Sequence, residues 1–78
     1  MQDDLEGAIK RVMADTLDLD VESIRENTSA ENVPNWDSAN HIQLVLALEE
    51  EFSISFDVAE IEAMFSFLDI VQMVQSKL

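Results

Sequence analysis

The stretch "WDSANHIQLVLALEEEF", residues 36–52, has the hydrophobic spacing of an amphipathic α-helix. At about 100° per residue, one side of such a helix collects most of its large apolar side chains. Asp37 stands where an N-cap is expected, so we predict a helix that runs from Asp37 to Phe52. The predicted core-facing stripe consists of His41, Leu44, Val45, Leu48 and Phe52.

The opposite face of this helix mixes carboxylates with apolar side chains. It carries Ala39, Gln43, Leu46 and Glu50, with Ile42 and Glu49 at its edge. Isolated exposed apolar residues are common in soluble proteins, so this face alone does not identify a docking surface. Because Glu49 and Glu50 lie off the core stripe, we expect reversal of their charge to leave the packing undisturbed.

The composition limits the chain to a small domain without thiol chemistry. Its 78 residues include no cysteine and one histidine, which excludes disulfides, thiolate ligands and most zinc sites. No apolar run approaches the roughly 20 residues that span a bilayer, and the N-terminus lacks a secretory signal pattern. We therefore expect a single domain over residues 1–78, located in the cytoplasm.

The charge of the chain is strongly negative, at a formal −13. Its four bases are Lys10, Arg11, Arg25 and Lys77, which leaves the middle of the chain without a lysine or arginine. Such a surface repels nucleic acids and anionic membranes and attracts basic partners. Because 47% of the residues are hydrophobic and only one is glycine and one proline, we expect a folded domain.

The pattern before the central helix predicts another helix and then a long loop. The helix covers residues 3–17, and its apolar stripe consists of Leu5, Ile9, Val12, Met13 and Leu17. Residues 18–37 lack a sustained period, and a loop of this length usually carries structure or function of its own. We expect four residues to hold this loop: Leu19, Val21 and Ile24 in the core, and Asp20 as the cap of a short turn.

Two further helices are expected after the central helix and a short extended segment, "SISF". Asp57 and Glu60 have the spacing of a capping box, which predicts a short helix that ends near Met64. Ser66 and Asp69 begin the last helix, whose stripe is Phe67, Ile70, Val71, Val74 and Leu78. No strand pair is visible. We predict an all-α fold, a small four-helix bundle of three longer helices and one short helix, with a long loop between the first and second helices.

Two groups of polar residues fit known sites incompletely. "DLDVES", after the first helix, begins like a calcium loop, but Ser23 and Ser29 replace the required glycine and glutamate. Asp37, Ser38 and His41 contain the groups of a catalytic triad. An oxyanion hole and a substrate cleft need a larger scaffold, however, and His41 lies on the core stripe. We predict no metal site and no catalytic residue.

Ser38 has two interpretations that the residues alone leave open. In the first, it is an ordinary first helical residue after the cap at Asp37, which is a common arrangement. In the second, its hydroxyl carries a covalently attached phosphate group. A phosphate there would lie near unpaired backbone N–H groups, where the helix dipole favours an anion.

With "WDSANHIQLVLALEEEF" and the last helix "SFLDIVQMV" in view, the chain resembles the free-standing acyl carrier proteins of fatty acid and polyketide biosynthesis. The likeness covers nearly the whole chain. It implies that Ser38, supported by Asp37, receives phosphopantetheine from coenzyme A through an external, Mg²⁺-dependent phosphopantetheinyl transferase. The thiol of that arm would hold acyl groups as thioesters, so the domain would be a carrier and not an enzyme.

The resemblance also implies partners and the surfaces that they use. Acyl-loading and acyl-processing enzymes with basic patches would dock on the second helix of a monomeric carrier. The docking candidates are Ala39, Gln43, Leu46, Glu49 and Glu50. The candidates for a space that shelters the acyl chain are Leu44, Val45, Ile61 and Met64.

Two positions depart from the family pattern. Ala39 replaces the leucine that usually follows the serine, and Gln43 is neutral where an acid is common. Both departures suggest a carrier dedicated to one pathway with its own partners. Two other functions remain open: a carrier for aminoacyl or peptidyl groups, and an unmodified acidic helical adaptor that binds a basic protein.

Overall fold

The computed structural model describes residues 2–78, with side chains from Leu5 onward. It contains α1 (Gln2–Leu17), the 3₁₀ turn η1 (Val21–Ser23), α2 (Ser38–Phe52), α3 (Val58–Ala63) and α4 (Phe67–Lys77). The predicted all-α bundle of three longer helices and one short helix is confirmed. Between residues 2 and 78, the β-structure is limited to an isolated bridge that joins Ser29 to Ser66.

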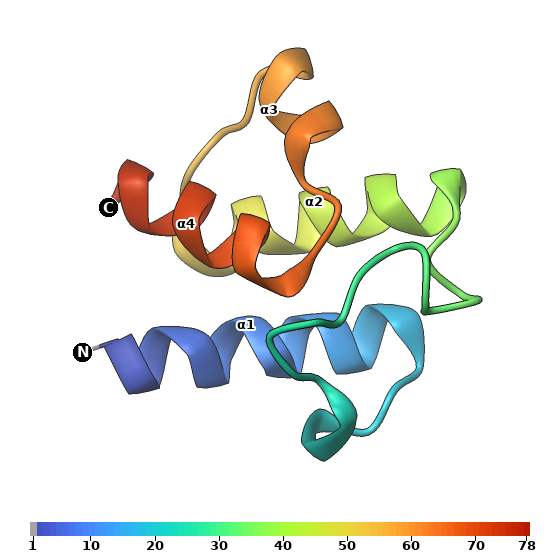
Figure 1. The fold of residues 1–78 in the computed structure, drawn as a ribbon. Coiled ribbons are helices and arrows are strands. Elements are labelled where there is room, and N and C mark those ends of the chain that lie inside the picture. Colours follow the sequence, from blue (N-terminus) through green and yellow to red (C-terminus); the bar gives the residue numbers. More distant parts are fainter. Residues whose placement is uncertain (1) are drawn as a thin grey trace.

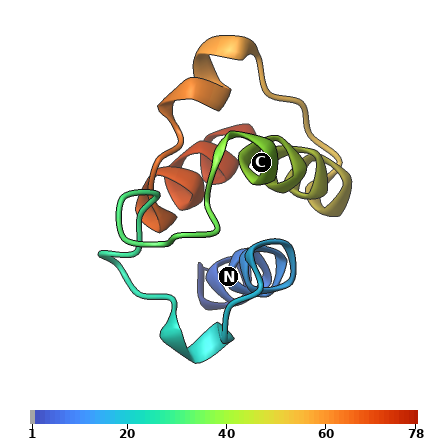
Figure 2. The ribbon, with the colours of Figure 1, turned by 90° about the vertical axis from the view of Figure 1, so that its right-hand side faces the viewer.

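Three helices form the body of the molecule, and the short α3 lies across one side of it (Figure 1). α1 packs against both α2 and α4. It runs antiparallel to them, and α4 follows the direction of α2. Figure 2 shows these three helices nearly end-on, with α3 at the far side of α2 and α4 from α1. Within residues 2–78, no helix is long and apolar enough to cross a bilayer.

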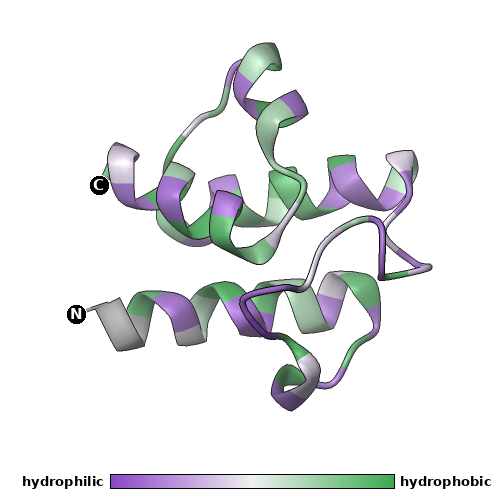
Figure 3. Ribbon diagram, in the orientation of Figure 1, coloured by the Kyte–Doolittle hydropathy of each residue, from purple (hydrophilic) through white to green (hydrophobic). Residues whose placement is uncertain are grey.

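The core lies between the three long helices, where Figure 3 shows their hydrophobic strips turned inward. Ile9, Met13 and Leu17 of α1 are completely buried, and Leu5 and Val12 pack beside them in part. The remaining buried core residues come from α2, α4 and the connecting segments: Ile24, Val33, Trp36, Leu44, Val45, Leu48, Phe56, Met64, Phe67, Ile70, Val71 and Val74. The predicted stripes therefore face the core over most of their length.

The helix starts follow local side-chain chemistry. Asp57 and Glu60 form the predicted capping box, in which each side chain accepts a hydrogen bond from the other residue's backbone N–H. The Ser66 hydroxyl accepts from the Asp69 N–H at 3.1 Å and so caps α4 as predicted. These contacts satisfy N–H groups that a helix start leaves without partners.

Two expectations for single residues, Val21 and Leu78, are wrong, and a third, for Asp20, is confirmed in part. Val21, which we expected in the core, is 41% exposed because it belongs to a one-turn helix that lies on the surface, whereas Ile24 is buried in the core as predicted. Asp20 is the N-cap of η1 as expected, but its side chain makes no capping hydrogen bond, and its backbone carbonyl accepts from the Ser23 hydroxyl. Leu78 is 70% exposed, because it follows the last helical turn and no longer shares the direction of the stripe.

The long loop is fixed to the junction between α3 and α4 by backbone hydrogen bonds. The Ala30 N–H donates to the Phe65 carbonyl at 2.8 Å, and the Phe67 N–H donates to the Thr28 carbonyl at 2.9 Å. Thr28 is buried, and its hydroxyl accepts from the Arg25 N–H. This pairing places Phe65 against the loop that leads into α2.

Candidate functional site

Ser38 is exposed and is the first residue of α2. Asp37 before it is the N-cap, with an extended backbone, and its Oδ1 accepts from the Asn40 N–H at 2.9 Å. The Asn40 side chain donates to the Asn35 carbonyl, and the Asn35 side chain donates to the carbonyl of Leu17 at the end of α1. The segment that precedes Ser38 is therefore tied by side-chain amides both to α2, through Asn40, and to the end of α1, through Asn35.

The position of Ser38 favours a negatively charged group on its hydroxyl. The first turn of a helix has backbone N–H groups without intrahelical partners, and the dipole of a 15-residue helix adds partial positive charge there. Asp37 occupies one of those N–H groups, that of Asn40. The others remain close to any group attached to Ser38.

A wide, mostly apolar hollow of about 710 Å³ lies between α2 and α3 and reaches Ser38. Ile42, Val58 and Phe65 line it, and all three are large hydrophobic residues that remain at least 49% exposed. Ile61 adds to the apolar lining, and Glu62 contributes a charged side chain to it. A contiguous group of exposed apolar side chains is typical of a surface that binds a ligand or a protein partner. We call this space the α2–α3 hollow.

A second, smaller hollow of about 160 Å³ also borders His41. Its lining consists of Ala30, Trp36, Asp37, Ser38, His41 and Phe65. We call it the Trp36 hollow. The two hollows share Ser38, His41 and Phe65. Ser38 therefore stands at the meeting point of two largely apolar spaces.

His41 is half-buried, and both of its ring nitrogens are engaged. Nδ1 accepts from the Trp36 indole N–H at 2.9 Å, and Nε2 lies 2.8 Å from the Ile61 carbonyl oxygen. These contacts leave neither nitrogen to take a proton from Ser38. His41 is thus placed as a boundary residue of the core, as the helical stripe predicted.

The residues predicted to shelter an acyl chain are divided between the hollow and the core. Ile61 lines the α2–α3 hollow, whereas Leu44, Val45 and Met64 are at most 3% exposed and fill the core. Sequence reasoning missed the other apolar residues of the wall, Ile42, Val58 and Phe65. The helical period places Ile42 at the edge of the outer face of α2, and only the position of α3 shows that this edge borders the hollow.

The predicted docking residues on α2 differ in their surroundings. Ala39, Gln43, Leu46 and Glu50 are exposed, and Leu46 is 54% exposed, so this part of the outer face is open to a partner. Glu49 is half-buried, and its Oε2 accepts from the Phe56 N–H at 2.8 Å. Its carboxylate is therefore already committed within the chain.

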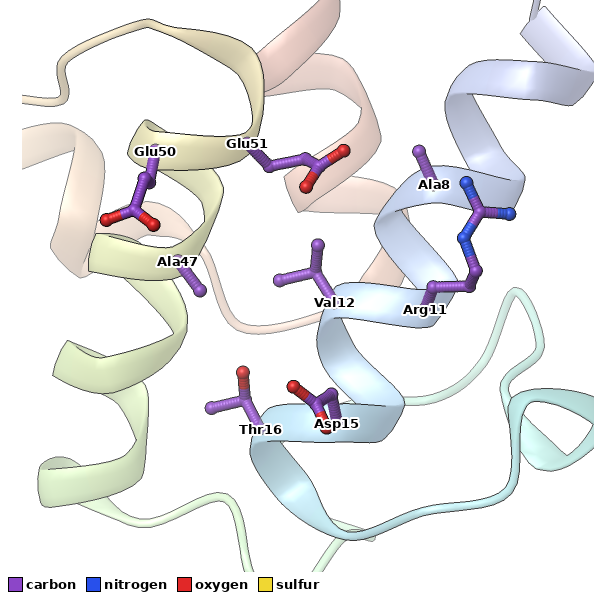
Figure 4. A pocket seen from close by; sticks show the side chains of 8 residues that line it. All are labelled: Ala8, Arg11, Val12, Asp15, Thr16, Ala47, Glu50 and Glu51. Carbon is purple, nitrogen blue, oxygen red and sulfur yellow. The ribbon is translucent and has the colours of Figure 1, made fainter.

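A third hollow lies between α1 and α2, more than two helical turns along α2 from Ser38 (Figure 4). Its lining includes Asp15, Glu50 and Glu51 together with Arg11. In Figure 4, Glu51 extends toward α1, and the Glu50 carboxylate lies farther from that helix. Charged groups of this density disfavour an apolar chain, so the α2–α3 hollow is the better candidate for apolar cargo.

Among the described residues, no group of three or more histidine, cysteine or acidic side chains is arranged to hold a metal ion. The site is thus built from one hydroxyl at a helix start, two adjoining apolar spaces and an acidic helix with exposed apolar residues.

Comparison with known proteins connects this arrangement to one family. No family model matches the chain. A protein named "Acyl carrier protein" from Lactobacillus acidophilus is 31% identical over 75 residues, which cover 96% of this chain and 94% of the relative. Proteins of the same name from Thermosynechococcus vestitus and a Picosynechococcus species are 29% and 36% identical, over 97% and 77% of this chain and 94% and 76% of their own lengths. By this similarity over almost its whole length, the chain belongs to the acyl carrier protein family.

Proposed function

We propose that this protein carries acyl intermediates as thioesters on a phosphopantetheine arm attached to Ser38. It would present them to enzymes of fatty acid, polyketide or a related biosynthesis. The observation that carries the proposal is the exposure of Ser38 at the start of α2, beside an apolar hollow. The proposal applies to this chain the function that the name of its relatives describes.

The residues around Ser38 suit such an arm. The Ser38 oxygen would form the new bond to phosphorus, while the pyrophosphate bond of coenzyme A breaks and the nucleotide leaves. Backbone N–H groups at the start of α2 would stabilise the phosphate, and Asp37 keeps that start in place. When bound, the arm supplies a thiol for thioester formation. Ile42, Val58 and Ile61 would exclude water from an apolar cargo.

The chemistry of attachment and loading would belong to partner enzymes. His41 is engaged by Trp36 and Ile61, so its ring is not available to Ser38 as a general base. An external phosphopantetheinyl transferase would have to provide that base. Acyl transfer would likewise occur in the active sites of loading and processing enzymes, and the protein itself would be a carrier without catalytic activity.

The exposed outer face of α2 is the surface that we propose for partner docking. Ala39, Gln43, Leu46 and Glu50 lie along it, and Ile42 continues it to the α2–α3 hollow. Its acidic end attracts basic patches, while Leu46 supplies apolar contact. The small Ala39 leaves space beside Ser38 where a leucine would project. A partner enzyme would fill that space with a larger side chain of its own, which favours a dedicated set of partners.

Intact-mass measurement tests the proposed function. The protein is incubated with a promiscuous phosphopantetheinyl transferase, Mg²⁺ and coenzyme A, and an unrelated carrier serves as the positive control. We expect one phosphopantetheine increment on the wild type and none on Ser38→Ala. Complete absence of the increment on the wild type, with the control carrier modified, would contradict the proposal and favour the unmodified adaptor.

Loading experiments then distinguish the cargo. An acyl group on the thiol, supplied by an acyl-transferring enzyme, supports the acyl carrier. Loading only by an adenylating enzyme that activates amino acids would show an aminoacyl or peptidyl carrier instead.

A further inference from the structure

One imidazole connects three segments of the chain around Ser38. The Trp36 indole N–H, in the loop before α2, donates to His41 Nδ1 at 2.9 Å. On the other side of the ring, His41 Nε2 lies 2.8 Å from the carbonyl oxygen of Ile61 in α3. The Trp36 and His41 rings are stacked, with their centroids 6.2 Å apart and their planes 27° apart. The loop, α2 and α3 therefore meet at His41.

The chemistry of these partners determines the form of the ring. An indole nitrogen can only donate a hydrogen bond, so His41 Nδ1 must accept. The ring proton of neutral His41 is then on Nε2, which donates to the Ile61 carbonyl. His41 thus acts as an acceptor toward one segment and a donor toward another.

The contact with Ile61 replaces a hydrogen bond that α3 does not make. An α-helix would continue with the Phe65 N–H donating to the Ile61 carbonyl, but that N–H donates to Asp69 Oδ2 at 3.2 Å. The Met64 N–H donates to the Ile61 carbonyl, but over a long distance of 3.4 Å. His41 therefore supplies the short hydrogen bond to a carbonyl at the end of α3, where helices leave such groups without intrahelical partners.

The position of the bridge relative to Ser38 gives it a role in the site. His41 lines both the α2–α3 hollow and the Trp36 hollow, as do Ser38 and Phe65. Its hydrogen bond with Trp36 fixes part of the lining of the Trp36 hollow. Its hydrogen bond with Ile61 fixes α3, which forms the wall of the α2–α3 hollow that faces α2. A change at His41 would therefore move the linings of both hollows that Ser38 borders, while Ser38 and its cap at Asp37 stay in place.

We propose that His41 is a positioning residue for the modification of Ser38. Its two hydrogen bonds hold Trp36 and the end of α3 in the arrangement that the transferase must recognise around the hydroxyl. This inference rests on the proposed carrier function, and it assigns to His41 a role beyond core packing. A histidine that served packing alone would affect the free energy of unfolding and leave the binding of the transferase unchanged.

Three substitutions at His41 separate its two contacts. The amide of asparagine can place an acceptor near the position of Nδ1, and the amide of glutamine can place a donor near that of Nε2. His41→Asn therefore keeps the link to Trp36, His41→Gln keeps the link to Ile61, and His41→Ala removes both. Trp36→Phe provides an independent test, because it removes the indole donor and retains an aromatic ring.

The first readout is hydrogen exchange by NMR on the unmodified protein. In His41→Ala and His41→Gln, we expect faster exchange of the Trp36 indole N–H, and in His41→Asn exchange near the wild-type rate. Amide protons near the end of α3, at Glu62 to Met64, should exchange faster in His41→Ala and His41→Asn than in His41→Gln. This readout does not depend on any modification of Ser38.

The second readout is the kinetics of the transferase with each variant as substrate. We expect His41→Ala to raise KM for the carrier by about three- to tenfold, the factor that corresponds to one or two net hydrogen bonds, with kcat little changed. His41→Asn, His41→Gln and Trp36→Phe should lie between His41→Ala and the wild type. If His41→Ala does not fold, these milder variants still show whether the contacts of His41 affect KM of the transferase for the carrier.

Val74→Ala is the matched control for stability, because Val74 is completely buried in α4 and does not line either hollow at Ser38. It should lower the free energy of unfolding and leave KM at the wild-type value. Wild-type KM in the folded His41 variants, or an equal rise in KM for Val74→Ala, would overturn the inference. Failure of the wild type to accept the modification would instead overturn the proposed carrier function.

Discussion

The carboxylate of Glu49 accepts a hydrogen bond from the backbone N–H of Phe56, seven residues later, at 2.8 Å. The Glu49 carbonyl accepts further bonds from the N–H groups of Ser53 and Ile54, and Ser53 turns the chain with a left-handed backbone. Glu49 therefore fixes the end of α2 to the segment that leads to α3. The expectation that charge reversal at Glu49 leaves the packing undisturbed is wrong for this reason.

The first prediction compares Glu49 with its neighbour Glu50. Glu49→Ala should lower the free energy of unfolding by about 1–2 kcal/mol, because the half-buried Phe56 N–H loses a charged acceptor. Glu50→Ala should change it by less than about 0.5 kcal/mol, since Glu50 is exposed. Urea denaturation followed by circular dichroism measures both. Equal effects of the two substitutions would show that the Glu49 contact does not stabilise the fold.

The second prediction tests the proposed docking face on α2. Glu50→Lys reverses an exposed charge there, so it should lower kcat/KM with a basic partner enzyme, and the loss should shrink as salt rises. Glu22→Lys in η1 is the control, because it changes the formal net charge of −13 by the same two units on a different part of the surface. Equal losses for both variants would indicate a general effect of net charge and exclude a local contact at Glu50.

The third prediction concerns salt. The acidic residues between Arg25 and Lys77 have no lysine or arginine among them, so they repel one another more in the folded chain than in the expanded one. Moderate NaCl or millimolar Mg²⁺ should raise Tm by a few degrees, since about 1 kcal/mol shifts Tm by about 4–8 °C at this size. KCl at the same ionic strength should act like NaCl. A Tm that stays flat or falls would contradict the expected repulsion.

The fourth prediction concerns the ion pair that joins α3 to the end of α4. Lys77 Nζ lies 2.8 Å from Glu60 Oε1. The hydrogen bond that Lys77 donates to the Glu60 carboxylate, together with the one from the Asp57 N–H, lowers the pKa of Glu60 below its ordinary value of 4.5. A lowered pKa in the folded state means that the pair stabilises the fold above the unfolded pKa. That contribution is lost as the pH falls through the folded pKa.

NMR titration of the Glu60 carboxyl carbon measures this effect. Lys77→Met should raise the pKa of Glu60 toward its ordinary value, whereas Lys10→Met, which removes a charge from α1, should leave it close to that of the wild type. An unchanged Glu60 titration in Lys77→Met would show that the ion pair does not persist in solution. The pair is partly exposed, so we expect a clear change in pKa and only a small change in stability.

Features of the fold that depend on neighbouring residues could be predicted from the sequence. The capping box of Asp57 and Glu60, and the cap of Ser66 on α4, involve partners three residues apart. The apolar stripes of the long helices follow from their period alone. The position of Ser38 as the first residue of α2 follows in the same way from its cap at Asp37.

Features that depend on chain segments distant in sequence could not be predicted. The His41 contact with Ile61 spans 20 residues, and the pairing of Ala30 with Phe65 spans more. No local pattern indicates that α3 lies beside the outer edge of α2, where it turns Ile42 into part of a hollow. The helical period predicted that Leu44 faces the core, but only the packing of the three long helices shows that this core leaves Leu44 outside the α2–α3 hollow.

The central claim is that Ser38 carries the arm, and peptide mapping tests it most directly. The modified protein is digested and fragmented by tandem mass spectrometry under conditions that keep the phosphodiester bond. We predict that the phosphopantetheine increment is confined to Ser38 and that Ser38→Ala, still folded by circular dichroism, carries none. An increment on another serine, such as Ser53 or Ser66, or one that persists in Ser38→Ala, would contradict the account.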